Sequence, residues 1–495
     1  MTKLTKISLG TALVLVVAGA AGYVTFKVKN PPPQLAEPDY YAYYLQQDMR
    51  PEGKVGVLIT QLIMPEDFRL GDYHNIALKS LQYIPWPIRN RVPADRGVAL
   101  LDPERFYEFE PFTPTRLEDV YGNDNDVDGV PYIEKFARGE VTWVPPSRTL
   151  HLDHGYFLLT RRHGGMPTMS AKLANKARVY YHGKGWVGPG KLPHEAGMRA
   201  IVEKSMARIQ EKYGPLQWRF TSAEDFGHAE RVTRELLDSG VQTLVMAPAA
   251  PIYSHHEEFN GSFKHAMHYV HEWEKEHGKQ IKVIFTRQLG DFDVLREAYL
   301  TMLRERLDTL PPDAAVKVAV SIHGMAWERV PHEAWLDLAP KYRDGMVADA
   351  RRVLEGYPFP RKEVVLSQDH FADPINDPQG KYLSTNKAFW DGVKDKYDYV
   401  VNLPIEFFSE NSDTMFSHAM FNFEHFPGFN RYEPVDYQDW SVPYTREFVI
   451  EGTHVIYNGL PVGRYNEPIV QAHVQALDEV LSKGVPARTA SASVE

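Results

Sequence analysis

The amino-acid sequence predicts an α/β fold built on parallel sheets with helices on both faces. From about residue 178 to residue 483, short β-branched apolar runs alternate with longer segments of helical periodicity, and such alternation is typical of parallel sheets. Two of the apolar runs, 316–320 and 400–404, lead directly into polar residues. Open α/β sheets bind ligands at the carboxyl ends of their strands. Because 495 residues exceed one average domain, we expect two α/β halves with insertions.

The individual elements follow from local pattern. β-Branched runs bounded by turn residues indicate strands, and apolar residues three or four positions apart indicate helices. Ser222 is the expected N-cap of one helix, with Glu224 and Asp225 in its first turn and Gly240 after its end. The predicted strands are 54–63, 216–220, 242–247, 281–285, 316–320, 363–367 and 400–404, and the predicted helices are 72–83, 195–213, 223–238, 264–277, 294–308, 344–356, 386–396 and 469–483.

Composition shifts divide the chain into five segments. Proline, aromatic and charged residues without clean periodicity mark an irregular insertion, and small residues at the carboxyl end indicate a disordered tail. The expected segments are an anchor or signal segment at 1–29, a proline-rich linker at 30–53, a first domain at 54–250 with the insertion at 85–177, a second domain at 251–483, and the tail at 484–495.

Residues 7–26 form an uncharged run of twenty residues, which is long enough to cross a bilayer as a helix. The stretch from Ala18 to Ala20 resembles a signal-peptidase site, so a cleaved signal is the competing interpretation. We favour an uncleaved membrane anchor because the apolar run continues past that site. With an inward-facing amino terminus, the body of the protein is expected outside the cytoplasm, which in a bacterium means on the outer side of the inner membrane.

Net charge and cysteine content exclude several classes of function. A net charge of -10 argues against nucleic-acid binding. The chain contains no cysteine, which excludes disulfides, a cysteine nucleophile, thiolate zinc sites and cysteine-ligated iron–sulfur clusters. Any metal site must therefore use histidine, carboxylate or carbonyl ligands.

Asp124, Asp126 and Asp128, followed by Gly129, have the spacing that begins a calcium-binding loop. The match is incomplete, since Lys135 stands at the twelfth position where a bidentate acid is expected. The motif is therefore interpreted either as a Ca²⁺ site or as a solvated acidic turn.

The strand at 316–320 is followed by Ser321, Ile322, His323 and Gly324. A histidine at the carboxyl end of a buried strand, next to a glycine that lets the chain turn, lies where α/β sheets bind ligands. A capped core histidine is the alternative. The second polar stretch, which follows the strand at 400–404, favours a functional role because it too is an apolar strand that runs into an acidic turn.

Three segments resemble motifs of the ferrochelatase family, in the family's order. Ser321-Ile-His323-Gly324 is similar to the strand that ends in S-A-H, and Pro251-Ile-Tyr253-Ser254 is similar to the P-Q-Y-S loop. Residues 404–415 (PIEFFSENSDTM) are similar to the late P-I-x-F-x-S-[DE]-H-x-E-T-L segment. Three further segments are more weakly similar to family motifs: 57–59 with 65–66 to the opening strand and G-G-P-E turn, 218–220 to the F-R-Y strand, and 366–368 to W-Q-S. The resemblance covers about 54–84 and 178–483.

The resemblance implies a pair of Rossmann-like domains with a porphyrin cleft between them and, as the reaction, insertion of Fe²⁺ into the porphyrin. It implies that His323 is the active-site histidine and that Asp413 is the acidic residue of the late motif. By the same resemblance, Tyr253 and Ser254 belong to the loop that contacts the tetrapyrrole.

The chemistry of metallation agrees with these residue types. The reaction needs a base for two pyrrole protons, and a histidine has a pKa close to working pH. It also needs ligands that hold a divalent ion without trapping it. A carboxylate and an imidazole together suit an ion such as Fe²⁺, which makes Asp413, Glu410 and His323 the candidate metal ligands. Aromatic side chains would line an apolar slot for the macrocycle, or else belong to the core. The aromatic candidates are Tyr253, Trp327, Phe407 and Phe408.

The sequence departs from the family at three places, and these departures bear on the metal and the substrate. Asn411 stands where the family has histidine, and Asp413 is one methylene shorter than the usual glutamate. His255 and His256 precede two glutamates, which indicates either a metal relay or a solvated helix start.

Three functions compete. The first is a membrane-anchored, ferrochelatase-like enzyme whose partners are a divalent metal, most simply Fe²⁺, and a tetrapyrrole. The second is a non-catalytic metal- or haem-binding protein on the same scaffold. A hydrolase or transferase ranks last, because the sequence has no G-x-S-x-G motif and no phosphate-binding loop.

Overall fold

The structure is a computed structural model of the whole chain. The residues that it describes are 44, 46–61, 63, 64, 66, 141–144, 156–159, 191–222, 226–248, 250–252, 263–322, 338–369, 383–407, 409–411, 414, 422, 423, 425–429 and 445–488.

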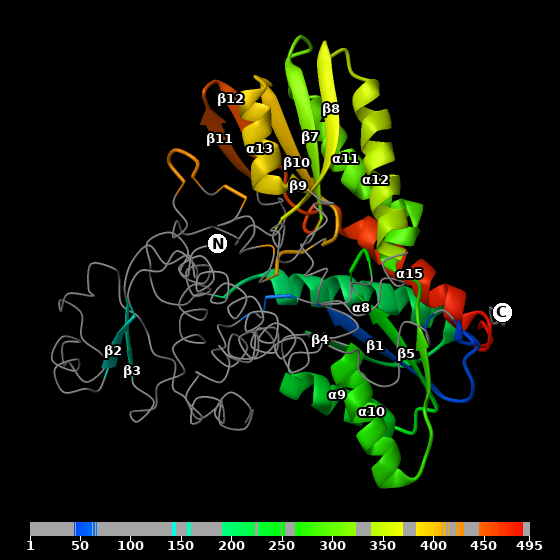
Figure 1. Cartoon of the computed structure of the whole chain (residues 1–495). Coiled ribbons are helices and arrows are strands. Elements are labelled where there is room, and N and C mark those ends of the chain that lie inside the picture. The colour runs from blue at the N-terminus through cyan, green and yellow to red at the C-terminus, as the bar shows by residue number, and fades with distance from the viewer. Residues whose placement is uncertain are drawn as a thin grey trace, which may run out of the picture.

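Two separate sheets confirm the α/β class (Figure 1). The first has the order β4-β1-β5-β6, and all its neighbours are parallel. Its strands are β1 (Val55–Gln61), β4 (Gln217–Ser222), β5 (Thr243–Pro248) and β6 (Lys282–Phe285). The predicted boundary between the two domains, at 250/251, is too early for the first sheet. β6 lies beyond that boundary, and the first sheet extends to Phe285.

The second sheet has the order β11-β12-β10-β7-β8-β9 and is parallel except at one edge, where β11 runs antiparallel to β12. Its strands are β7 (Ala315–Ile322), β8 (Arg361–Gln368), β9 (Leu383–Ser384), β10 (Tyr399–Pro404), β11 (Arg446–Ile450) and β12 (Thr453–Tyr457). Strands β9, β11 and β12 were not predicted from the sequence. Inside the expected insertion, β2 (Val141–Val144) and β3 (Tyr156–Leu159) form an unpredicted antiparallel pair.

Helices cover both faces of each sheet. The helices are α8 (His194–Tyr213), α9 (Phe226–Asp238), α10 (Phe263–His277), α11 (Asp293–Leu307), α12 (Leu338–Glu355), α13 (Thr385–Lys394) and α15 (Asn466–Leu481), with the short η5 (Leu289–Asp291) before α11. Alternate residues of β7 point to opposite faces. Val318 and Val320 pack in the cluster that contains α11 and α12, whereas Ala319 packs against α13.

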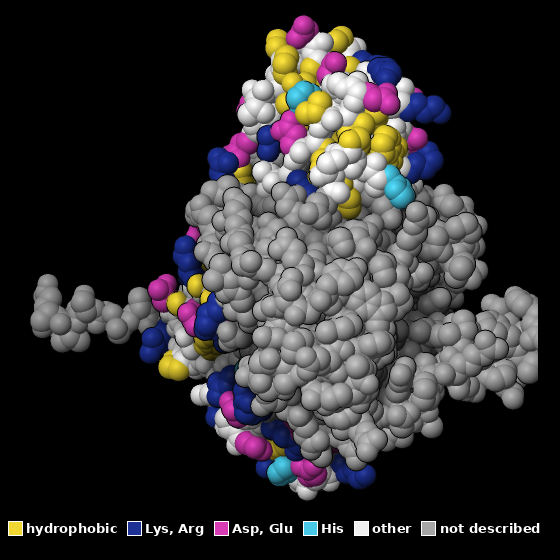
Figure 2. All heavy atoms as spheres, turned by 90° about the vertical axis from the view of Figure 1, so that its left-hand side faces the viewer, with side chains coloured by type: hydrophobic (Ala, Val, Ile, Leu, Met, Phe, Trp, Pro, Cys, Tyr) yellow, Lys and Arg dark blue, Asp and Glu magenta, His cyan; other side chains and the backbone are white. Residues whose placement is uncertain are grey.

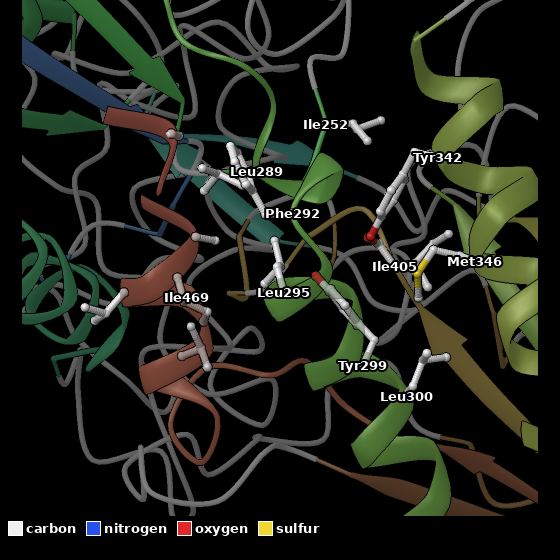
Figure 3. Packing of buried hydrophobic residues seen from close by; sticks show 14 of the residues in the cluster. Ile252, Leu289, Phe292, Leu295, Tyr299, Leu300, Tyr342, Met346, Ile405 and Ile469 are labelled. Carbon is white, nitrogen blue, oxygen red and sulfur yellow. The ribbon is translucent and has the colours of Figure 1, made fainter. Parts of the chain in front are cut away.

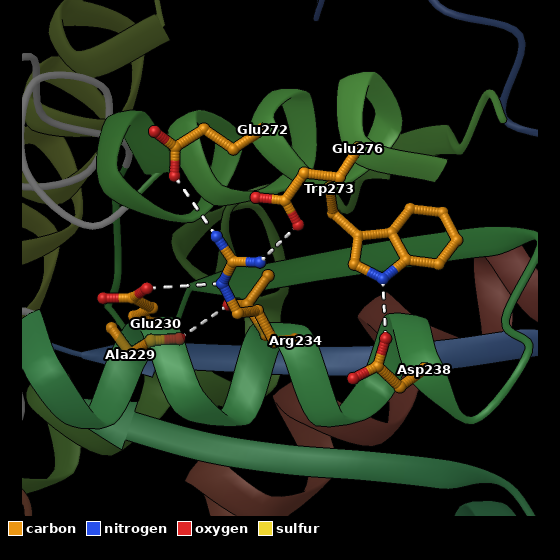
Figure 4. Close-up of polar contacts among 8 residues, drawn as sticks. Ala229, Glu230, Arg234, Asp238, Glu272, Trp273 and Glu276 are labelled. Carbon is orange, nitrogen blue, oxygen red and sulfur yellow. Dashed lines mark hydrogen bonds and ion pairs between the residues drawn. The ribbon is translucent and has the colours of Figure 1, made fainter. Parts of the chain in front are cut away.

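The largest hydrophobic cluster runs continuously from one sheet to the other. It contains Val57 and Ile59 of β1 together with residues of α8, α15, α11, α12 and β7. In Figure 1, α8 and α15 lie between the two sheets. The other face of the first sheet packs against α9 and α10, where Arg234 of α9 bridges to Glu272 and Glu276 of α10 (Figure 4).

Two of the differences between predicted and observed helix boundaries have a local explanation. α12 begins at Leu338 rather than 344, because Pro340 is tolerated in the first turn of a helix although it reads as a helix breaker. Ser222 is not a helix N-cap, since it ends β4 and α9 begins at Phe226. Its hydroxyl instead donates a hydrogen bond to the Ile63 carbonyl at 3.2 Å, which ties the ends of β4 and β1 together.

Both flanks of the body make ordered contacts. Near the end of the expected linker, Gln47 exchanges two hydrogen bonds of 2.8 Å with the backbone of Phe285 at the edge of β6. At the start of the expected tail, the Arg488 N–H donates to the Lys212 carbonyl at 2.7 Å. On the face shown in Figure 2, basic and acidic side chains of the described residues are interspersed. Within the described ranges no helix combines the length and apolar character needed to span a bilayer, and residues 7–26 lie outside them.

Candidate functional site

The strands of the second sheet end together at one edge. β7, β8 and β10 are parallel neighbours, with Ser321 in register with Ser367 on one side and with Pro404 on the other. The ladder continues past the strand ends, where the Ile405 N–H donates to the Ser321 carbonyl and the Asp369 N–H donates to the Ile322 carbonyl, both at 3.0 Å. The carboxyl ends of these three strands therefore lie side by side at this edge.

Two buried tyrosines hold the backbone that follows β10. The Tyr342 hydroxyl of α12 donates to the Ile405 carbonyl at 2.7 Å, and the Tyr299 hydroxyl of α11 donates to the Phe407 carbonyl at 2.6 Å. Burial raises the pKa of both tyrosines well above the ordinary value. Both hydroxyls therefore stay protonated and act as donors.

A buried ion pair lies between these two hydrogen bonds. The Arg343 guanidinium of α12 donates from Nε to Oε1 of Glu406. Arg343 is 0% exposed and Glu406 is 4% exposed, so both charges are removed from water. Residues 405, 406 and 407 are thus each held by a different side chain.

The turn after Phe407 is fixed by its own polar side chains. The Asn411 side chain accepts from the Thr414 N–H at 3.0 Å, while the Thr414 hydroxyl accepts from the Asn411 N–H at 2.8 Å. This reciprocal pair has the form of a capping box, which asparagine suits well. Glu410 accepts from the Thr414 hydroxyl at 2.7 Å and from the Tyr457 hydroxyl at 2.9 Å. Both carboxylate oxygens of Glu410 are therefore engaged within the fold, and its role as a metal ligand stays a prediction.

Two polar groups at this edge were missed from the sequence. His194, the first residue of α8, is 3% exposed, and burial lowers its pKa to about 4 against the opposing effect of the Glu410 charge. α8, which packs against the first sheet, thus brings a neutral imidazole close enough to the turn after β10 for the charge of Glu410 to act on it. Asp369 accepts from Thr385 at 2.9 Å and from Asn422 at 3.1 Å. No local motif marks either residue.

The segment before Tyr253 joins the same region. The Gly290 N–H of η5 donates to the Pro251 carbonyl at 2.5 Å, and the ring of Tyr342 lies so close to Gly290 that an added Cβ would be 2.6 Å from it. Figure 3 shows Ile252, Tyr342 and Ile405 around this point. Ile252, Ile322 and Ile405 belong to one buried cluster.

Among the residues nominated from the sequence, Glu410 and Phe407 lie in described parts of the chain. Among the described residues, no group of three or more histidine or acidic side chains is arranged to hold a metal ion. The nominated residues that lie outside the described ranges are Asp124, Asp126, Asp128, Tyr253, Ser254, His255, His256, His323, Trp327, Phe408 and Asp413. A comparison with known proteins found no family model and no curated protein that matches the chain.

Proposed function

We propose that the protein is a membrane-anchored chelatase that inserts a divalent metal, Fe²⁺ in the first instance, into a porphyrin or a related tetrapyrrole. The metal replaces the two protons of the pyrrole N–H groups, so each turnover releases two protons. His323 accepts a pyrrole proton as the base, and Asp413 holds the incoming ion. The finer fold that goes with this proposal is a pair of Rossmann-like domains facing each other across a cleft.

The observation that carries the proposal is the convergence of the flanks of all three motifs. Ile252 precedes Tyr253, Ile322 precedes His323, and Ile405 lies in the late motif. All three isoleucines are at most 2% exposed and pack in one cluster. Direct contacts also link the three segments: the Pro251 carbonyl accepts from the Gly290 N–H, Gly290 lies against the Tyr342 ring, the Tyr342 hydroxyl donates to the Ile405 carbonyl, and the Ile405 N–H donates to the Ser321 carbonyl. Segments about 70 residues apart or more in sequence are therefore neighbours, which is what a shared site requires.

Strand adjacency supports the pairing of His323 with Asp413. β7 ends one residue before His323, and its hydrogen-bonded neighbour β10 leads into the turn in which Asn411 and Thr414 bond to each other across Asp413. Parallel neighbours expose their carboxyl ends at the same edge. The buried His194 supports a contribution from the first half, because α8 packs against β1 and the charge of Glu410 acts on the pKa of His194.

The proposal is tested by anaerobic metallation. Purified full-length chain in detergent is mixed with Fe²⁺, Co²⁺ or Zn²⁺ and each of several porphyrins, and the loss of the free-base absorption is followed. We expect turnover with at least one pair, and we expect His323→Asn and Asp413→Asn to abolish it without lowering Tm. Partly exposed, paired residues of the same types supply matched controls, namely His454→Asn and Asp391→Asn.

The outcomes separate the chelatase from its alternative. If the protein binds tetrapyrrole or metal without metallation, and if Asp413→Asn leaves this binding unchanged, the non-catalytic binder is favoured. Full activity in His323→Asn would remove the proposed base. No metallation with any metal and porphyrin would defeat the enzymatic proposal.

A further inference from the structure

Three consecutive residues after β10 are held from one side by α11 and α12, through side chains that we call the 405–407 clamp. The clamp consists of Tyr299, Tyr342 and Arg343, which bind Phe407, Ile405 and Glu406 respectively. Two of its contacts are to backbone carbonyls and one is to a carboxylate. Such a set fixes both the path of the backbone and its distance from the helices.

The buried ion pair in the clamp is expected to contribute little net free energy to folding. Removing two charges from water costs several kcal/mol per ion, and a well-packed apolar pair of similar volume is often equally stable or more so. A buried pair does restrict its partners to one geometry, because both charges must meet. Arg343 and Glu406 join α12 to the end of β10 in this way.

The clamp lies directly upstream of the carboxylate turn, residues 409–414. Downstream support comes from the other side of the sheet, where Tyr457 at the end of β12 donates to Glu410 at 2.9 Å. The turn is thus held at two places, by α11 and α12 just before its first residue and by β12 at its second residue. Ser409 and Asn411, on either side of Glu410, are also fully buried, so we expect a shift at residues 405–407 to displace Glu410 as well.

We propose that the 405–407 clamp, and the Arg343–Glu406 pair within it, positions the carboxylate turn for metal transfer. Arg343, Glu406 and Tyr299 are positioning residues, since they act through the turn rather than on the metal or the tetrapyrrole. This inference rests on the proposed function, and its experiment therefore includes a measurement that does not depend on activity.

The test replaces the pair by apolar side chains of similar length, Arg343→Met with Glu406→Met, in the full-length chain. We expect an unchanged or higher Tm, a kcat lowered by about tenfold to a hundredfold because the turn is misplaced by up to about 1 Å, and an unchanged KM for the porphyrin. Hydrogen exchange of peptides that cover 409–414 should become faster. The single variant Glu406→Gln keeps an acceptor for Arg343. Its kcat should therefore lie much closer to the wild-type value than that of the Arg343/Glu406 double variant.

The matched control is Arg234→Met with Glu276→Met, an ion pair between α9 and α10 on the outer face of the first sheet (Figure 4). It should leave kcat and exchange of the turn at wild-type values. Wild-type kcat and exchange in the Arg343/Glu406 variant would overturn the proposal. If that variant fails to fold, Tyr299→Phe decides, because it removes one hydrogen bond: slower turnover at wild-type Tm supports the clamp, and wild-type turnover refutes it.

The two proposals fail in distinguishable ways. A wild-type chain without metallation activity defeats the proposed function, and exchange of the turn still tests the clamp. A wild-type chain that metallates porphyrin, together with an equally active Arg343/Glu406 variant, leaves the function standing and removes the clamp.

Discussion

His194 and His473 are buried in helices that pack between the two sheets, with exposures of 3% and 2%. Burial lowers the pKa of each to about 4 from an ordinary value of 6.5. The folded protein therefore keeps both imidazoles neutral at pH values at which the unfolded chain protonates them. Each histidine ties stability to pH.

The sign of the effect follows from proton binding. Between pH 6.5 and about pH 4 the unfolded chain binds more protons than the folded chain, so the free energy of unfolding falls as the pH is lowered through this window. The loss amounts to about 3 kcal/mol per histidine. Urea unfolding at several pH values should show this slope, and His473→Gln should flatten it. A slope unchanged by His473→Gln but changed by His454→Gln, at a partly exposed position, would contradict the account.

At the residue scale, the polar residues that follow β7 and β10 could be predicted from the sequence, but the contacts among the side chains at this edge could not. The acidic turn after β10 was predicted, yet one of the two partners of Glu410 is Tyr457, 47 positions away in sequence. The same holds for Arg343 and Glu406, 63 positions apart. Such pairings depend on how strands and helices assemble, and no local pattern encodes them. His194 was missed for this reason, although the helix that it begins was predicted.

At the element scale, the helices and buried strands in the described residues were predicted to within a few residues, except for the start of α12 at Leu338, whereas edge strands were not predicted. The predicted helix 72–83 lies outside the described residues. β11 and β12 did carry a signal. Two β-branched runs flank Glu451 and Gly452, and both of these residues have positive φ, 49° and 90°. A turn of this kind is typical of a tight hairpin, but glutamate is a weak marker of it. The antiparallel edge was consequently overlooked.

Close packing of η5 against α12 gives a prediction at this scale. An added Cβ at Gly290 would lie 2.6 Å from both the Pro251 carbonyl and the Tyr342 ring. Gly290→Ala should therefore destabilise the fold by about 1–3 kcal/mol. Gly345→Ala in α12 meets no atom within 4 Å, and it should stabilise by up to about 1 kcal/mol because alanine favours helix. Thermal unfolding compares the two, and equal shifts would contradict the packing.

At the scale of the whole molecule, the two sheets repeat one connection order. Apart from β9 and β11, each has its first strand in the centre, the second on one side, and the third and fourth on the other. Thr60 at the end of β1 and Ser321 near the end of β7 occupy matching positions, each in register with a proline and a hydroxyl residue. No repeat was visible in the sequence, because the similarity is one of topology.

The halves also exchange helices. α11 follows the first sheet but packs against α12 of the second half, and α15 follows the second sheet but packs against α8 of the first. Glu467 of α15 accepts from Lys204 and Arg208 of α8 at 2.7 and 2.6 Å. The charge of Glu410, at the carboxyl edge of the second sheet, acts on the pKa of His194 at the start of α8. Long-range packing of this kind is beyond local sequence patterns.

The central claim is that His323 and Asp413 share one metal site at the carboxyl edge of β7 and β10. Anomalous diffraction from crystals of the full-length chain soaked with Co²⁺ tests it most directly. The account predicts an anomalous peak at coordinating distance from both side chains, and its loss in Asp413→Asn. A peak only at His255 and His256, or only at Asp124, Asp126 and Asp128, would contradict it, as would His323 and Asp413 lying apart with packed side chains between them.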